Sequence, residues 1–188
     1  MKEHPFLAMD SVARAILTGR QTQDRRPIDF VRRIGRVAEF QVSTSRGFDF
    51  IMRDRRGAWN DLGYEELVAR LPWQPGDLLY VREAWMPACD EGCCAYYRAD
   101  YAQGQPPGLW AAARWRPNIH MPKKLTRTWL RVERVWIEQV QDISEEDARA
   151  EGCASIAEFR ELWDSLYGTW GANPWVRCCE FKVVAHHD

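Results

Sequence analysis

Cysteine and histidine are the first side chains to weigh, because they bind metals and act as nucleophiles. The chain has six cysteines, and His186-His187 lies at its end. A zinc site assembled from these residues would need four well-placed N or S ligands, and clean Cys-x2-Cys spacing is missing. We therefore expect reduced thiols, mostly buried, and no metal or other cofactor. The residues that could have formed such a site are Cys89, Cys93, Cys94, Cys178, Cys179, His186 and His187.

The common catalytic and nucleotide-binding motifs are absent from the sequence. It contains no GxGxxG and no GxxxxGK[ST]. The glycine-rich loops that bind phosphate in dinucleotide-binding proteins and in P-loop NTPases are therefore absent. GxSxG and HExxH are also missing. The sequence thus excludes the best-known hydrolase, metalloprotease and NTPase signatures.

Charge is strongly segregated along a chain whose formal net charge is only -1. Residues 1–56 hold twelve Lys or Arg against seven acids, and residues 138–164 hold nine acids against two arginines. Residues 110–136 hold seven basic residues and the single acid Glu133. A local basic face of this kind is what a phosphate backbone meets. The alternative is that basic and acidic elements lie side by side and neutralise each other.

Helix and strand signals predict an α+β fold. We expect helices over 10–18, capped by Asp10 or Ser11 and ended by Gly19, and over 64–71. Ser144 and Ser155 begin capping boxes that predict helices near 145–151 and 156–167. Strands are predicted at 78–83, 128–140 and 175–184, with a hairpin of 36–43 and 47–53. Short strands dominate, which favours a small mixed β-barrel with peripheral helices.

Several blocks of the sequence carry a resemblance to a known family. They are GRQTQDRR (19–26), QPGDLLYVREAW (74–85), YYRAD (96–100), WRPNIHMPK (115–123), DISEEDARAEG (142–152), LWDSLYG (162–168) and NPWVRCCEFK (173–182). In this order they resemble the ASCH domain family, and most closely the ASCH proteins of bacteriophages and prophages. The resemblance is weakest over residues 30–70. It implies one PUA-like domain over residues 1–188, with a loop insertion at about 86–118 and a helical segment at about 144–168.

The family signature is a Gly, a Lys two residues later and an Arg seven residues after the Gly. Gly19 and Arg26 match it, but Gln21 occupies the Lys position. Hydrolytic members, which remove acyl groups from N4-acylcytidine, use that Lys, a Thr three residues beyond it and a downstream Glu. Here Asp24 occupies the Thr position and Glu151 the Glu position. The resemblance thus implies Glu151, Asp24 and Gln21 as catalytic candidates, whereas the alternative is that Asp24 pairs with Arg25 or Arg26.

The matched blocks also suggest residues that bind a ligand in a cleft beside the first helix. Aromatic residues among them could stack a base, although a tryptophan more often fills the core, and a lone histidine is more often structural. The expected ligand-binding residues are Gly19, Gln21, Thr22, Arg26, Arg82, Glu83, Tyr97, Arg98, His120, Asn173 and Trp175. The expected phosphate-contacting residues are Lys123, Lys124 and Arg127.

Three functions follow as hypotheses. The first is a module that binds RNA, DNA or a modified nucleoside, and the second is an amidohydrolase acting on N4-acylcytidine with Glu151 as general base. The third is a phage protein that uses the barrel only as a scaffold for protein contacts. No apolar run approaches the roughly 20 residues of a membrane helix, and the first ten residues contain no secretory h-region. We therefore expect a cytoplasmic protein with no membrane partner. The resemblance to phage and prophage ASCH proteins further implies a phage or prophage protein in a bacterial host.

Overall fold

The computed structural model describes residues 1–88, 94–101 and 114–185. Within these ranges the chain forms two compact units. Unit 1 contains residues 1–22, 76–131 and 181 onward, and unit 2 contains residues 23–75 and 132–180. The prediction of a single domain over 1–188 stays a prediction.

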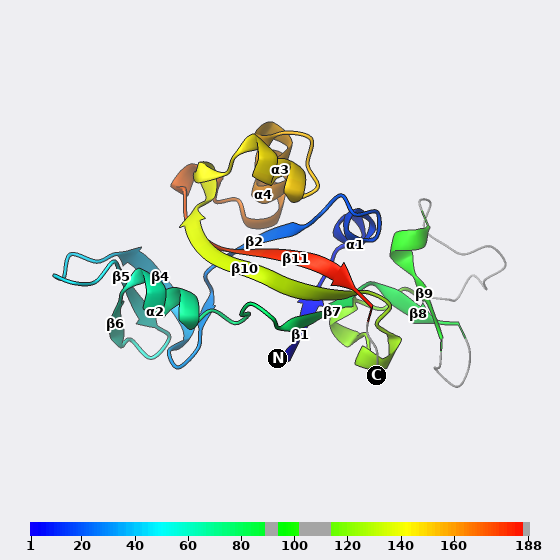
Figure 1. The fold of residues 1–188 in the computed structure, drawn as a ribbon, viewed down its shortest axis with the longest axis horizontal. Helices are drawn as coiled ribbons and strands as arrows, with labels where there is room; N and C mark the ends of the chain where they lie inside the picture. Colours follow the sequence, from blue (N-terminus) through cyan, green and yellow to red (C-terminus); the bar gives the residue numbers. More distant parts are fainter. Residues whose placement is uncertain (89–93, 102–113, 186–188) are drawn as a thin grey trace. The chain divides into compact units, whose positions relative to one another are not determined.

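The main sheet is mixed, with strand order β1-β7-β10-β11-β2. Only β1 and β7 pair in parallel, and β7 with β10 and β11 with β2 pair antiparallel. The long strands β10 and β11 each begin in one unit and end in the other. Figure 1 shows β10 as a strongly curved strand, as expected in a barrel-like sheet. The strands of this sheet are β1 (Glu3–Leu7), β2 (Gln23–Pro27), β7 (Leu78–Arg82), β10 (Trp129–Gln139) and β11 (Trp175–Val184).

The predicted α+β fold is confirmed, because a mixed sheet is combined with short helices. Unit 1 contains α1 (Asp10–Leu17), and unit 2 contains α2 (Tyr64–Ala69), α3 (Glu145–Ala150) and α4 (Ile156–Tyr167). Short 3-10 turns cover Arg98–Asp100, Asn118–His120, Lys123–Leu125, Val140–Asp142 and Trp170–Ala172. Of the residues described, no helix has the length and apolar character needed to cross a membrane.

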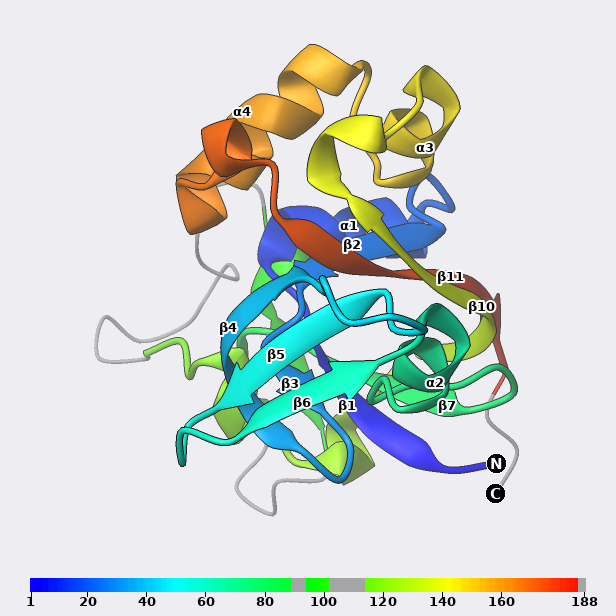
Figure 2. The same ribbon diagram turned by 90° about the vertical axis from the view of Figure 1, so that its left-hand side faces the viewer.

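Unit 2 also contains a small antiparallel sheet, ordered β3-β4-β5-β6. Its strands are β3 (Phe30–Val31), β4 (Gly35–Val42), β5 (Phe50–Asp54) and β6 (Trp59–Leu62). Figure 2 shows β4, β5 and β6 as neighbours with α2 beside them. Phe50, Met52 and Leu67 belong to the buried cluster that joins this sheet to α2. The predicted hairpin is therefore present, with β4 and β5 as its strands.

The remaining core follows the same strands and helices. In unit 2, Phe159 and Trp163 of α4 pack with Val176 and Cys178 of β11. In unit 1, the rings of Phe6 and Phe181 meet edge to face, with centroids 5.9 Å apart. A further short pair in unit 1, β8 (Trp85–Pro87) and β9 (Ala95–Tyr97), lies within the predicted loop insertion.

Helix starts follow the sequence signals in two cases and differ in one. Ser144 and Asp147 form the complete capping box of α3, and the Ser155 side chain accepts the amide of Glu158 at the start of α4. The expected cap of the first helix was wrong, because α1 begins after Met9, without a side-chain cap. Gly19 follows this helix with φ +69°, a left-handed conformation that glycine adopts without strain.

Candidate functional site

The segment 19–26 is divided between the two units. Gly19, Gln21 and Thr22 belong to unit 1, where the amide of Gln21 donates to the carbonyl of Ala15 at the end of α1. Gln23 onward forms β2 in unit 2, antiparallel to β11. Successive residues of a strand face opposite sides, so the side chains of Arg25 and Arg26 lie on two different faces of β2 in unit 2.

Arg25 is the centre of a buried polar cluster on the first of these surfaces. Its side chain is 0% exposed, and its Nε donates to Glu138 Oε1 at 2.8 Å. Its Nη1 donates to Gln23 Oε1 at 2.8 Å and to Glu151 Oε1 at 3.0 Å, while Nη2 lies 3.5 Å from Asp147 Oδ2. One guanidinium thus faces three carboxylates from β10, α3 and the residue after α3. We call these four residues, Arg25, Glu138, Asp147 and Glu151, the Arg25 cluster.

The pKa values of the two acids near α3 are shifted in opposite directions. Burial raises the pKa of Glu151, the nearby charge of Asp24 raises it further, and Arg25 only partly opposes this shift. Burial also acts to raise the pKa of Asp147, but the Ser144 hydrogen bond and the charge of Arg25 outweigh it and hold that pKa below its ordinary value. A protonated Glu151 still accepts the Arg25 hydrogen bond through its carbonyl oxygen. Of the two acids, Glu151 therefore takes up a proton at higher pH than Asp147 does.

Arg26 lies on the other surface of β2, where it pairs with Asp24. Its Nε donates to Asp24 Oδ2 at 2.7 Å and its Nη2 to Asp24 Oδ1 at 3.2 Å. The ion pair that was the alternative to a catalytic Asp24 is therefore present. Arg177 of β11 is directly opposite Arg26 in the strand register. The two guanidinium carbons lie 5.5 Å and 4.4 Å from the ring centroid of Trp73.

At this second surface the carboxylates of Asp24 and Asp29 also act on Arg177, so two acids stand against the two arginines. Among the described residues, the buried Nε of Arg177 has no hydrogen-bond partner. Burial and the charge of Arg26 together lower the pKa of Arg177. Like charges directly opposite each other across two strands destabilise the pair, and here the Asp24 carboxylate, which bonds Arg26 and acts on Arg177, partly offsets this repulsion.

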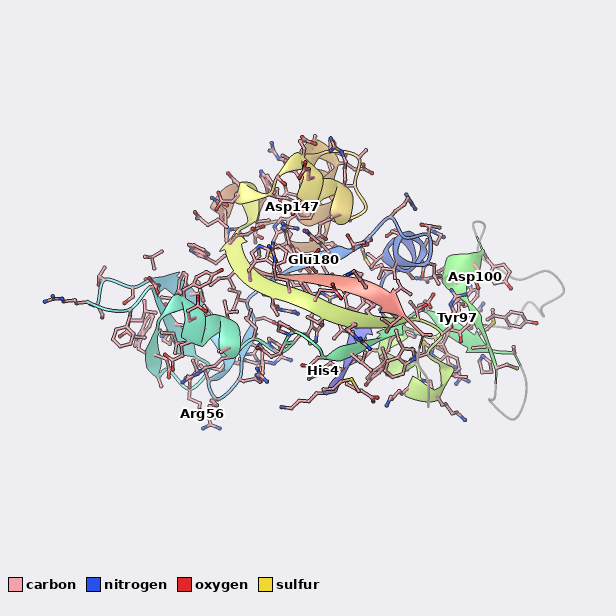
Figure 3. All side chains as sticks on the ribbon, viewed as in Figure 1. His4, Arg56, Tyr97, Asp100, Asp147 and Glu180 are labelled. Atoms are coloured by element: carbon pink, nitrogen blue, oxygen red, sulfur yellow. The ribbon has the colours of Figure 1, made fainter. Side chains whose placement is uncertain are left out.

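The predicted site residues of unit 1 are mostly engaged with each other. Arg127 donates to Glu83 Oε1 at 2.9 Å and to Asp100 Oδ2 at 2.7 Å, and lies 4.0 Å from the ring centroid of Tyr97. Figure 3 shows Tyr97 and Asp100 close together in unit 1. The Tyr97 hydroxyl donates to the carbonyl of Leu125. This group is therefore internally satisfied.

Other predicted residues of unit 1 also have structural partners. Arg82 donates to the carbonyls of Met121 and Ile119, and Arg98 pairs with Asp10 at 2.5 Å. His120 is exposed on a 3-10 turn. These contacts give Arg82 and Arg98 structural roles in unit 1.

The expected phosphate-contacting residues line one pocket of about 600 Å³ in unit 1. Lys123, however, pairs with Glu3 and lies over the rings of Tyr80 and Trp129. Because Arg127 is also paired, only Lys124 of the three has no such contact within the described part of the chain. Most of the positive charge of these three residues is therefore neutralised within unit 1.

Asn173 and Trp175 are the predicted ligand residues near the start of β11. The Asn173 side chain accepts the amide of Gln141 at 3.0 Å, and φ +45° places this residue in the left-handed region. The Trp175 ring packs edge to face on Phe50, 4.9 Å between centroids, as part of the small-sheet core. Both residues thus have structural contacts within unit 2.

Arg25 was not predicted as a site residue, although one signal for it was present. If this segment forms a strand, its two consecutive arginines face opposite sides and do not contact the same ligand. The cysteines opposite them, Cys178 and Cys179, are buried, and burial raises the pKa of both thiols. No metal-binding group of His, Cys, Asp or Glu is found among residues 1–88, 94–101 and 114–185. Four of the zinc candidates, Cys89, Cys93, His186 and His187, lie outside the described residues.

Comparisons with known proteins give similarity only among solved structures. No family model matches the chain, and no curated protein matches it. An ASCH domain from Lactobacillus crispatus JV V101 is 14% identical, with a TM-score of 0.45, over 98% of this chain and 81% of that one. A DUF984 protein from Enterococcus faecalis V583 is 12% identical, with a TM-score of 0.42, over 100% of this chain and 86% of that one.

Proposed function

We propose that the protein binds a nucleic acid or a modified nucleotide, and that Arg26 and Arg177 hold an anionic group of that ligand. The observation that carries this proposal is the pair of facing guanidinium groups on β2 and β11. Asp24 engages Arg26 through two hydrogen bonds, while a buried donor of Arg177 has no hydrogen-bond partner among the described residues. Planar guanidinium groups bind phosphate oxygens through paired hydrogen bonds, and a phosphate would relieve the repulsion between them.

An aromatic side chain stands close to this pair. Tyr167, at the end of α4, is 38% exposed, and both Arg26 and Arg177 act on the pKa of its hydroxyl, against the raising effect of burial. It supplies a partly exposed ring for a base, a role that Trp73 cannot take because it is only 5% exposed. The proposed ligand therefore combines a phosphate with a base, as a nucleotide does.

The test is binding of a fluorescein-labelled 20-nucleotide RNA, a DNA of the same sequence and labelled nucleoside monophosphates. Arg177→Gln leaves the pair of Asp24 and Arg26 in place, so it removes a ligand contact without exposing a new charge. We expect it to weaken binding about tenfold or more, because a charge-assisted hydrogen bond is lost. Arg26→Ala should abolish binding, with thermal melting recorded to detect any loss of folding.

Arg149→Gln removes an exposed arginine from α3 and is the matched control. It should leave affinity unchanged. Unchanged affinity in both Arg177→Gln and Arg26→Ala, or no binding of any of these probes by the wild type, would contradict the proposal.

Glu151 supports a second function, the removal of an acyl group from N4-acylcytidine. Its raised pKa keeps a proton on a carboxyl group close to neutral pH, as a general acid-base catalyst requires. Gln21 occupies the position of the family Lys and cannot take up or release a proton there. The assay is cytidine release from N4-acetylcytidine. Release that Glu151→Gln abolishes would favour this function, and no release by the wild type would remove it.

A further inference from the structure

Four arginines in unit 2 surround one pocket at an end of the small sheet. Arg33 lies in the turn between β3 and β4, and Arg36 follows it in β4. Arg55 and Arg56 begin the turn between β5 and β6. All four side chains are exposed, and they line a pocket of about 390 Å³. Figure 3 shows Arg56 at this end of the small sheet. We call these four residues the arginine turns.

The backbone holds the two turns together. The amide of Arg55 donates to the carbonyl of Arg36 at 3.3 Å, and Val37 pairs with Asp54 in the strand register. Gly57, with φ +89°, allows the tight second turn. Sheet pairing therefore brings the two turns that carry these arginines to the same end of the small sheet.

No carboxylate within the described residues forms an ion pair with any of these four arginines. Asp54, the acid in the pocket, accepts the amides of Arg56 and Ala58 at 2.8 and 2.9 Å through one oxygen. Its carboxylate is thus directed to the turn backbone. This differs from unit 1, where Lys123 and Arg127 pair with acids. The arginine turns therefore bring four positive charges to a pocket whose lining holds one carboxylate, that of Asp54, so positive charge is in excess there.

Exposed aromatic rings lie next to this charge. Phe30 is 39% exposed, lines the same pocket and is directly opposite Arg36 in the pairing of β3 and β4. Trp59, 50% exposed at the start of β6, lies under the guanidinium of Arg53 at 5.6 Å. Proteins bind single-stranded nucleic acid with basic side chains along its phosphate backbone and with aromatic rings that stack on its unpaired bases. The arginine turns and Phe30 offer both kinds of side chain.

We propose that the arginine turns and Phe30 bind the phosphate backbone of single-stranded nucleic acid. This inference rests on the proposed function only for the class of ligand, since the surface uses neither Arg26 nor Arg177. This surface binds phosphates and stacks on bases, and neither contact depends on the nucleotide sequence. A chain of several nucleotides is needed to reach several arginines, so a mononucleotide gains little from this surface.

The experiment measures binding of the labelled 20-nucleotide RNA and DNA at several salt concentrations, with the double variants Arg55→Gln/Arg56→Gln and Arg33→Gln/Arg36→Gln. Each phosphate contact on a single strand contributes about 0.7 to the slope of log affinity against log salt. We expect each double variant to lower that slope by up to about 1.4 and to weaken binding about tenfold. Phe30→Ala should weaken binding without changing the salt slope, because stacking releases no counterions.

Arg149→Gln/Arg160→Gln is the matched control, since it removes two exposed arginines from α3 and α4. It should change neither affinity nor slope. Arg177→Gln and Arg26→Ala separate the two proposals. If neither changes affinity while the turn variants weaken binding, the site of Arg26 and Arg177 fails and the arginine turns stand. If the turn variants match the control, the arginine turns are not a backbone site.

Competition by polyglutamate, added at the same concentration of negative charges as the RNA, tests whether the partner is a nucleic acid or an acidic polypeptide. Weak competition against RNA supports nucleic acid, whereas full displacement shows that an acidic polypeptide fits the surface as well and overturns the proposal. A wild type that binds neither the RNA nor the DNA overturns it too.

Discussion

Arg25 and Arg26 are neighbours in the sequence, and the geometry of a strand gives them different surroundings. Arg25 is fully buried and contacts Glu138 and Glu151, which lie 113 and 126 residues away. Arg26 contacts Asp24, two residues away, and faces Arg177 on the next strand. The first arginine therefore joins β2 to β10 and to the end of α3 through buried hydrogen bonds, and the second lies on a surface where Asp24 and Arg177 are its neighbours.

The protonation of Glu151 makes the stability of the protein depend on pH. Its pKa is raised above the ordinary value of 4.5 in the folded state, so the folded protein binds more protons than the unfolded chain above that pH. The free energy of unfolding should therefore fall as the pH rises from about 5 toward the raised pKa. Urea denaturation at pH 5 and pH 8 measures this loss, which we expect to be about 1 kcal/mol or more.

Glu151→Gln is the informative variant, since glutamine has the shape of the protonated acid and does not titrate. Its stability should change less between pH 5 and pH 8 than that of the wild type. An equal change in the two proteins would show that another group causes the pH dependence and that Glu151 is ionised in the fold.

At the scale of elements, α3 is the helix that positions two acids of the Arg25 cluster. Asp147 is its third residue and Glu151 follows its last turn. The helix has only six residues, so it depends on its cap and on packing for stability. Ser144 accepts the amide of Asp147 at 3.0 Å and donates its hydroxyl to that carboxylate at 2.7 Å. The cap therefore fixes both the helix start and the acid that faces Arg25.

Ser144→Ala should destabilise the protein by about 1 kcal/mol, the usual cost of losing an N-cap serine. It should also raise the pKa of Asp147, because the hydroxyl hydrogen bond that favours the carboxylate is lost. Chemical denaturation at pH 7 gives the first quantity, and NMR titration of the side-chain carboxyl gives the second. Ser11→Ala is the control: Ser11 is exposed in α1 and does not cap it, so stability should stay within about 0.5 kcal/mol. A similar loss in both variants would contradict the role of the cap.

The same elements show what local sequence signals predict and what they miss. The helix of residues 156–167, the strand of residues 175–184 and the Ser144 box have local signals, and all three are present. The contacts of Arg25 depend on how β2, β10 and α3 come together across more than 100 residues, which periodicity does not encode. The arginine turns were missed for a similar reason, because Arg36 and Arg55 meet only through strand pairing.

At the scale of the whole molecule, the net charge of -1 conceals local surfaces of opposite character. The basic segment around Lys123 and Arg127 looked like the nucleic-acid surface in the sequence, yet acids in unit 1 pair with both residues. The arginine turns have no such partners in the described part of unit 2. A count of charges along the sequence therefore locates basic residues without showing which of them are available to a ligand.

A variant that changes the net charge but leaves the arginine turns intact tests whether overall charge or this local surface attracts the RNA. Glu146→Gln/Glu161→Gln removes two exposed acids from α3 and α4, which lie in a different part of unit 2 from the turn between β5 and β6 (Figure 1). Interactions between exposed charges are largely screened beyond about 8 Å at physiological salt, so affinity for the 20-nucleotide RNA should change less than about twofold at 150 mM salt. Arg55→Gln/Arg56→Gln changes the net charge by the same amount in the opposite direction and should weaken binding about tenfold. A gain in affinity from the acid variant as large as the loss from the arginine variant would show that overall charge, and no particular surface, attracts the ligand.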